Sequence, residues 1–67
     1  PMRYSLVMHT AVPEYVAACY GPTGSGLRTT LDPDDACSWL LYESAAKVAK
    51  HLMQSTDLDV SIRTVNF

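Results

Sequence analysis

The sequence predicts an α+β domain in which a small antiparallel sheet of three or four strands carries one amphipathic helix on one face. The helix is predicted from the run Glu43–Gln54, whose apolar residues recur at intervals of three and four. The strands are predicted from runs on both sides of it that alternate apolar and polar residues. Segments rich in proline, glycine and aspartate separate these runs, as turns do. We therefore expect residues 1–67 to form a single domain with the element order β-β-(β)-α-β.

Two strands and a shorter third one are expected before the helix. Arg3–Thr10 and Glu14–Tyr20 alternate apolar and polar side chains, and Pro13 interrupts the pattern between them because proline cannot donate a backbone hydrogen bond. The glycines of residues 21–26 then predict a loop, and Leu27–Leu31 resumes the alternation. Together these segments predict a hairpin with a long tip.

The second half of the chain predicts a helical turn, the helix and a last strand. Asp32–Ala36 has aspartate at an N-cap position and proline at the first helical position, which favours a short helical turn. Ser38–Tyr42 is expected to be a brief extended piece that carries Trp39 into the core. After the helix, Leu58–Ile62 alternates as a half-buried strand does. The alternation shifts at Thr64, which predicts a bulge or an edge that leaves the sheet.

The predicted core joins one stripe of the helix to one face of the sheet. Residues at i, i+3, i+4 and i+7 lie on one side of a helix, and alternate residues of a strand lie on one face. The core residues expected on this basis are Leu6, Met8, Trp39, Ala45, Val48, Ala49, Leu52, Val60 and Ile62.

Composition and charge favour a small globular protein of the cytoplasm. The apolar content of 48% is ordinary for such a protein. No apolar run reaches the ~18 residues of a membrane-spanning helix, and no segment resembles a signal peptide. The net charge is −2 and the basic residues are scattered, which argues against direct binding to nucleic acid. Cys19 and Cys37 are expected to be small buried apolar side chains, and a disulfide between them is the alternative.

No set of residues in the sequence predicts catalysis, a metal site or a cofactor. The glycines of residues 21–26 lack the Gly-Lys-Ser/Thr ending of a phosphate-binding loop and lead into a strand. His9 is predicted on a strand and His51 on the solvated side of the helix, so the sequence predicts no Cys–His or Ser–His dyad. A pair of His9 with Cys19 on adjacent strands is geometrically possible but is not predicted. A chain of this length also has little volume for a substrate pocket. We therefore expect a protein that is not an enzyme and uses no cofactor.

Pro1 leaves one enzymatic alternative open. Because Met2 follows it, we expect Pro1 to be a remnant of tag cleavage. An amino-terminal proline followed by a strand also resembles the opening of the tautomerase superfamily, and that resemblance implies Pro1 as the catalytic base. The chain departs from those enzymes after the first strand, where they continue into a long helix and this sequence has a turn and a strand, Val12–Val16.

Acidic and tyrosine side chains predict a surface that binds a partner. Asp34, Asp35 and Glu43 cluster around a turn, and Tyr42 beside them can bury contact area at low entropic cost. We expect these four residues to bind a basic surface of a larger protein, without contact to nucleic acid or membrane. One alternative is that the acids only solvate the turn and the helix start. Another is that the chain is a self-associating domain, such as a homodimer that pairs through a strand edge.

The chain resembles the small inhibitor proteins that phages and mobile elements encode, of which anti-CRISPR proteins are the best-populated group. The resemblance rests on size, acidity, the order of strands and helix, and the lack of catalytic residues. It extends over the whole chain but contains no specific motif, so no functional residue is carried over from it. It implies a compact acidic domain that blocks a basic or nucleic-acid-binding surface of a host protein complex.

Overall fold

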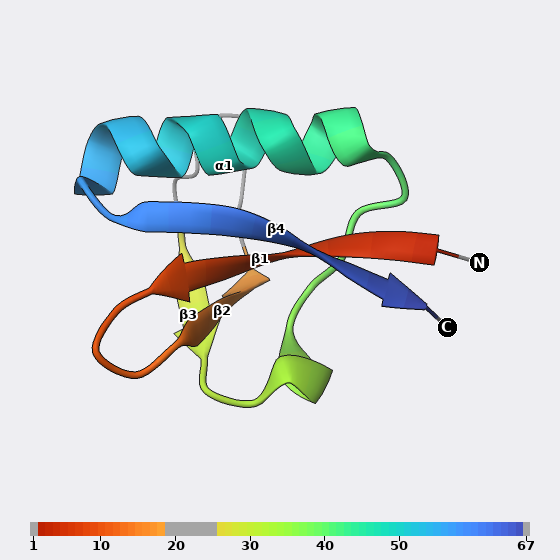
Figure 1. Cartoon of the computed structure of the whole chain (residues 1–67), viewed down its shortest axis with the longest axis horizontal. Helices are drawn as coiled ribbons and strands as arrows, with labels where there is room; N and C mark the ends of the chain where they lie inside the picture. The colour runs from red at the N-terminus through yellow and green to blue at the C-terminus, as the bar shows by residue number, and fades with distance from the viewer. Residues whose placement is uncertain (1, 19–25, 67) are drawn as a thin grey trace.

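A computed structural model describes residues 2–18 and 26–66, which form a four-stranded sheet with an α-helix on it (Figure 1). The elements are β1 (Met2–His9), β2 (Glu14–Ala18), β3 (Arg28–Thr30), the single 3-10 turn η1 (Pro33–Asp35), α1 (Tyr42–Thr56) and β4 (Asp59–Asn66). The strand order across the sheet is β3-β2-β1-β4, and every neighbouring pair is antiparallel. The predicted α+β fold, one helix on a small antiparallel sheet, is confirmed.

The long strands β1 and β4 form the backbone of the sheet. They pair without interruption from Met2 opposite Asn66 to His9 opposite Asp59. The helix α1 lies along this pair, above β4 in the view of Figure 1. Because α1 and β4 are joined by a tight turn, the helix runs back over the strand that follows it. This arrangement lets a single helix cover both long strands.

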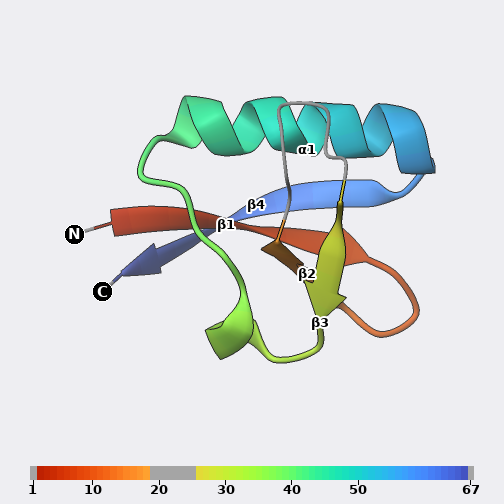
Figure 2. The ribbon, with the colours of Figure 1, turned by 180° about the vertical axis from the view of Figure 1, so that it is seen from behind.

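A linker segment completes the sheet where β2 leaves β1. The strand β2 pairs with β1 only at Val7 and Met8, so the first half of β1 has no strand neighbour on that side. Trp39 fills part of this gap: its N–H donates to Tyr4 O at 2.7 Å, and Tyr4 N–H donates to Trp39 O at 2.9 Å. Cys37 N–H donates to Val16 O at 3.0 Å. Figure 2 shows this linker rising from η1, past the sheet, to the start of α1.

The core lies between α1 and one face of the sheet, as predicted. Its fully buried members are Leu6, Met8, Val16, Ala45, Val48, Ala49, Leu52 and Val60. Trp39 and Ile62 are half-buried and pack against this cluster. Val16, which the predicted core left out, is fully buried because β2 lies in the interior of the sheet. Two of the four helix residues in the core are alanines, which lets α1 approach the sheet closely.

The two ends of α1 differ from the usual capping pattern. Leu41 is at the N-cap position and makes no side-chain hydrogen bond to the first turn, where serine, threonine or aspartate is preferred. At the other end, Asp57 has φ 60° and ψ 19°, the left-handed conformation that glycine usually supplies. Aspartate tolerates this conformation better than most residues. It allows the chain to turn directly from α1 into β4.

Two details of the sequence prediction need correction. Tyr42 is the first residue of α1, not the end of an extended piece, because the helix starts one residue before Glu43. The predicted bulge at Thr64 is wrong, since β4 stays in register with β1 through Asn66. The irregularity is instead between Val16 and Ala18, where β2 pairs with β3. The predicted helical turn is confirmed as η1. The last two residues predicted for the second strand lie outside the described residues.

Leu52→Ala tests the helix–sheet contact. Leu52 is 1% exposed, and its truncation should lower the free energy of unfolding by about 2–5 kcal/mol. Gln54→Ala, on the exposed side of α1, is the matched control and should change the stability by less than about 0.5 kcal/mol. Urea titration of both variants gives the comparison. Equal stability of the two variants would mean that the buried side of α1 is assigned wrongly.

Candidate protein-binding surfaces

The four residues predicted to bind a partner lie in two separate places. Asp34 and Asp35 belong to η1, and Tyr42 and Glu43 belong to the first turn of α1; all four are exposed. In Figures 1 and 2, η1 lies at the lower edge of the molecule and α1 along the upper edge, with β1 and β4 between them. The structure therefore brings each pair together but does not join the two pairs into one acidic patch.

The acidic residues of η1 are held in place by a local cap. The Asp32 side chain accepts a hydrogen bond from Asp34 N–H at 2.9 Å, and Asp35 N–H donates to Asp32 O at 3.0 Å. These bonds fix the backbone of the turn and leave the Asp34 and Asp35 side chains exposed. The two carboxylates can therefore act on a partner only as exposed charges. Such charges speed association more than they strengthen the complex.

The start of α1 and the start of β1 carry a group of exposed apolar side chains, of which the sequence prediction named Tyr42 alone. We call it the apolar end: Met2 (55% exposed), Leu40 (64%), Leu41 (64%) and Tyr42 (57%). Tyr4 connects Met2 with Tyr42, because its ring meets the Tyr42 ring edge-on with centroids 5.6 Å apart and its hydroxyl lies 3.8 Å from Met2 Sδ. Leu40 and Leu41 directly precede Tyr42 in the chain. Exposed apolar side chains that gather in one place, unlike scattered ones, are typical of interaction sites.

The apolar end is held rigidly by the segment before it. Trp39 is bonded to β1 through both of its backbone groups. Arg3 Nε donates to Ser38 Oγ at 2.7 Å, and its Nη2 donates to Ser38 O at 3.3 Å. Leu40 and Leu41 therefore project from an anchored backbone. Little conformational entropy would be lost when a partner covers them.

A small hollow of about 80 Å³ lies on the sheet face opposite α1, beneath η1. Its lining includes Ser5, Asp34, Ser38 and Arg63. Ser5 is 2% exposed, and its Oγ has no hydrogen-bond partner among the described residues. A buried hydroxyl without a partner costs stability, because it has lost its bonds to water. The turn η1 thus covers this face of the sheet imperfectly.

A longer hollow of about 570 Å³ follows the outer side of α1 and is open to solvent. It is lined by helix side chains between Tyr42 and Gln54, including Lys47, Lys50 and His51. Among the described lining residues, none forms a hydrogen-bonded pair of nucleophile and base. The hollow is therefore a surface groove rather than a site that surrounds a substrate.

One hydrogen bond joins groups that catalyse reactions in other proteins. His9 Nε2 lies 2.6 Å from Ser61 Oγ, and Asp59 is opposite His9 in the β1–β4 register. Serine, histidine and aspartate form the catalytic triad of many hydrolases, but there they line a pocket with donors for the developing oxyanion. Here His9, Ser61 and Asp59 are exposed, and neither hollow described above is lined by them. The hydrogen bond between His9 and Ser61 links the end of β1 to β4.

The described residues hold no further chemical centre. No three His, Cys, Asp or Glu side chains of residues 2–18 and 26–66 gather as ligands of a metal ion. In the same part of the chain, no helix combines the length and the apolar character that crossing a membrane requires. Cys37 is half-buried against the core. The pairing of His9 with Cys19, which the sequence left geometrically possible without predicting it, lies outside the described residues because Cys19 does.

Comparison of the chain with models of protein families, with curated proteins and with solved structures finds no match to any of them. The residues that act in this protein therefore have to be inferred from its own geometry. The apolar end stands out in that geometry, because its large apolar side chains are exposed although the fold buries other apolar residues.

Ser5→Ala tests whether the hollow under η1 is a defect of packing. Removing the unpartnered Oγ should raise the free energy of unfolding by about 1 kcal/mol. Ser38→Ala is the matched control and should lower stability, because Ser38 Oγ accepts a bond from Arg3. Thermal and urea unfolding measure both. A loss of stability in Ser5→Ala would show that the Ser5 hydroxyl is bonded after all.

Proposed function

We propose that this protein is a non-catalytic protein-binding module that docks through its apolar end. The observation that carries the proposal is the exposure of Leu40, Leu41 and Tyr42 at the start of α1, on a backbone anchored to β1. Burying a leucine side chain completely is worth about 1.5–3 kcal/mol. A few residues near the centre of an interface supply most of its binding energy, and tyrosine is one of the types most often found there.

The residue at the N-cap of α1 supports a binding role, because it makes the helix less stable than a capping residue would. Leu41 stands at the N-cap of α1, where a serine or aspartate would stabilise the helix by about 1 kcal/mol. Leu41 also exposes most of its surface to water. Neither property favours the isolated fold. A partner that covers Leu41 accounts for both.

The charges around the apolar end suggest the character of the partner. Glu43 follows Tyr42 and is exposed, so one carboxylate lies beside the apolar side chains. The partner surface that matches this arrangement is an apolar depression with basic residues beside it. Asp34 and Asp35, at the other edge of the molecule, would guide the approach to a basic surface over a distance.

An inhibitor of a larger complex is the role that these features favour. A small acidic domain that covers a basic or nucleic-acid-binding surface can block it without chemistry of its own. This is the mode of action implied by the resemblance to small phage inhibitors of the anti-CRISPR type. The proposal places the chain in the cytoplasm, where a host nucleoprotein complex would be its target.

Leu41→Ser separates binding from stability. The substitution supplies an N-cap side chain and removes an anchor, so unfolding should cost about 0.5–2 kcal/mol more while partner affinity falls at least about tenfold. Leu31→Ser is the matched control, because Leu31 is 63% exposed away from the apolar end. Wild type and both variants are used as bait in lysate of the organism that carries the gene. Affinity for the recovered protein is then measured.

The outcome decides between surfaces. Recovery of one protein by wild type and Leu31→Ser, but not by Leu41→Ser, supports docking at the apolar end. Equal affinity of all three baits for the same protein would move the binding surface elsewhere, and recovery of no specific protein would contradict the proposal.

Asp34→Lys/Asp35→Lys should slow association and reduce its dependence on salt, with little change in the dissociation rate.

A further inference from the structure

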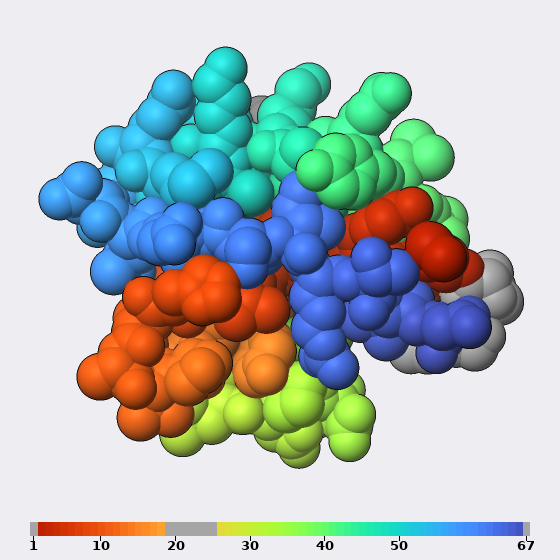
Figure 3. Space-filling model, viewed as in Figure 1, coloured from red at the N-terminus to blue at the C-terminus, as the bar shows by residue number. Residues whose placement is uncertain are grey.

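The strand β4 has an outer edge that no described segment covers. It is the last strand of the sheet and pairs with β1 on its inner side only. Figure 3 shows β4 crossing one face of the molecule from side to side with nothing over it. Proteins usually protect such an edge with proline, a bulge or like charges. From Asp59 to Asn66, β4 has no proline, no irregularity in its pairing and one charge of each sign.

The backbone groups that point outward from β4 can be identified. Both backbone groups of Tyr4 bond to Trp39, so they point away from β4. Directions alternate along a strand, and therefore Ser5 and Val7 direct their backbone groups toward β4. Their partners there are Arg63 and Ser61. The backbone N–H and C=O groups of Val60 and Ile62, which alternate with these residues in β4, therefore face outward.

The charges of β4 are arranged so that the strand is complementary to itself. Asp59 and Arg63 are exposed on the same face of the strand, with Ser61 midway between them. When two copies of β4 run antiparallel about an axis through Ser61, Asp59 of each copy lies opposite Arg63 of the other. Val60 then lies opposite Ile62 of the other copy, and these two residues carry the outward-facing backbone groups.

We propose that the outer edge of β4 binds a second copy of this chain, antiparallel and with the two-fold axis at Ser61. Four backbone hydrogen bonds link Val60 and Ile62 across the axis. Two cross-strand contacts of opposite charge, Asp59 with Arg63, set the register. The competing register with its axis at Arg63 places two guanidinium groups opposite each other, which is unfavourable. In the single chain the Arg63 guanidinium lies 5.6 Å from the centre of the Tyr15 ring, and it turns from this weak surface contact to reach Asp59.

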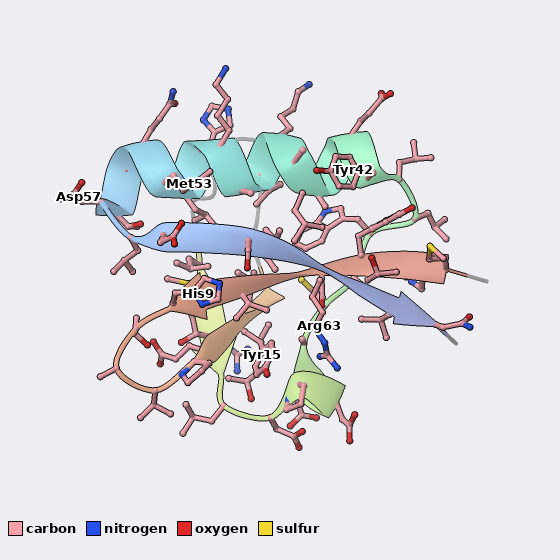
Figure 4. The ribbon with its side chains drawn as sticks, in the orientation of Figure 1. His9, Tyr15, Tyr42, Met53, Asp57 and Arg63 are labelled. Atoms are coloured by element: carbon pink, nitrogen blue, oxygen red, sulfur yellow. The ribbon has the colours of Figure 1, made fainter. Side chains whose placement is uncertain are left out.

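The helix adds an apolar contact to the same interface. Figure 4 shows Met53 on α1 above the first part of β4, and Tyr42 farther along, above its second part. Because α1 lies over β1 and β4 and strands are about 4.8 Å apart, the helix of the second copy would lie about 10 Å away. That distance is close to the 8–10 Å of packed helices. Met53, 41% exposed, then meets its own copy near the axis.

The pairing leaves the apolar end free. The axis at Ser61 lies in the first half of β4, whereas Tyr42 and Leu41 are at the other end of α1. The dimer would present two copies of the docking surface, and the inference does not rest on the proposed function. With a ladder of five residues on each side, the interface is small, so we expect dissociation constants in the micromolar to millimolar range.

A charge exchange tests the register. Asp59→Lys or Arg63→Glu alone replaces two attractive contacts per dimer by two repulsive ones, and the dissociation constant should rise at least about tenfold. The double variant Asp59→Lys/Arg63→Glu restores opposite charges and should return to within about threefold of wild type. Sedimentation equilibrium over micromolar to millimolar protein measures all three, and circular dichroism confirms that each variant is folded.

The control carries the same change of net charge elsewhere. Arg28→Glu makes the same change as Arg63→Glu at an exposed position of β3, the strand at the opposite edge of the sheet, and should leave the dissociation constant nearly unchanged. A wild-type protein that stays monomeric up to millimolar concentration overturns the proposal. So does a double variant that associates as weakly as the single ones.

A cross-link tests the axis independently. In the proposed register the two Ser61 residues form a pair without backbone hydrogen bonds, with Cα atoms about 4.5 Å apart, which a disulfide can span. Under mild oxidation Ser61→Cys should form a covalent dimer. Thr64→Cys, whose two copies would lie far apart, should not form one beyond the wild-type level. Equal cross-linking of the two variants would overturn the assignment of the axis to Ser61.

Discussion

The pair of backbone hydrogen bonds between Tyr4 and Trp39 is the interaction on which the rest of the structure depends. These bonds fill part of the place beside β1 that β2 vacates. They also bring the linker across the sheet to the point where α1 begins. Without them, the Cys37 bond to Val16 and the Arg3 bonds to Ser38 would be the remaining hydrogen bonds described between the linker and the sheet, and the backbone just before the apolar end would lose its direct bonds to β1.

The small size of the domain explains why its surface is more informative than its interior. In the described part of the chain, one helix covers one face of the sheet, and only the 3-10 turn η1 and its flanks lie against part of the other. A chain of this length cannot bury all of its apolar residues. Which of them remain outside is therefore decided by the path of the backbone. Leu40 and Leu41 remain outside because Trp39, immediately before them, is the residue held against the sheet.

Two positions are unfavourable for the stability of the fold, and both lie beside surfaces described above. Leu41 at the N-cap of α1 costs free energy in a domain with a thin core, and the Ser5 hydroxyl, which has no partner among the described residues, is predicted to do the same. Leu41 belongs to the surface that we propose binds a partner, which would then cover its exposed side chain. Ser5 lies under η1, where the charged residues Asp34 and Arg63 border the same hollow. Positions where a protein departs from the locally stabilising choice are often at functional sites.

The sequence by itself determined the elements, because each has a period that short-range physics imposes. The stripe of Ala45, Val48, Ala49 and Leu52 and the alternation in β1 and β4 specify a helix and two strands with a buried side each. Only the tertiary structure decided which of the candidate binding residues lie together. Asp35 and Tyr42 are close in sequence, yet the linker crosses the sheet between them and separates them in space. Trp39 and Leu40 are both apolar, and only the bridge to Tyr4, 35 residues away in the sequence, turns one inward and the other outward. A local sequence pattern around Trp39 carries no information about this contact, because Tyr4 lies in a strand far away in the sequence.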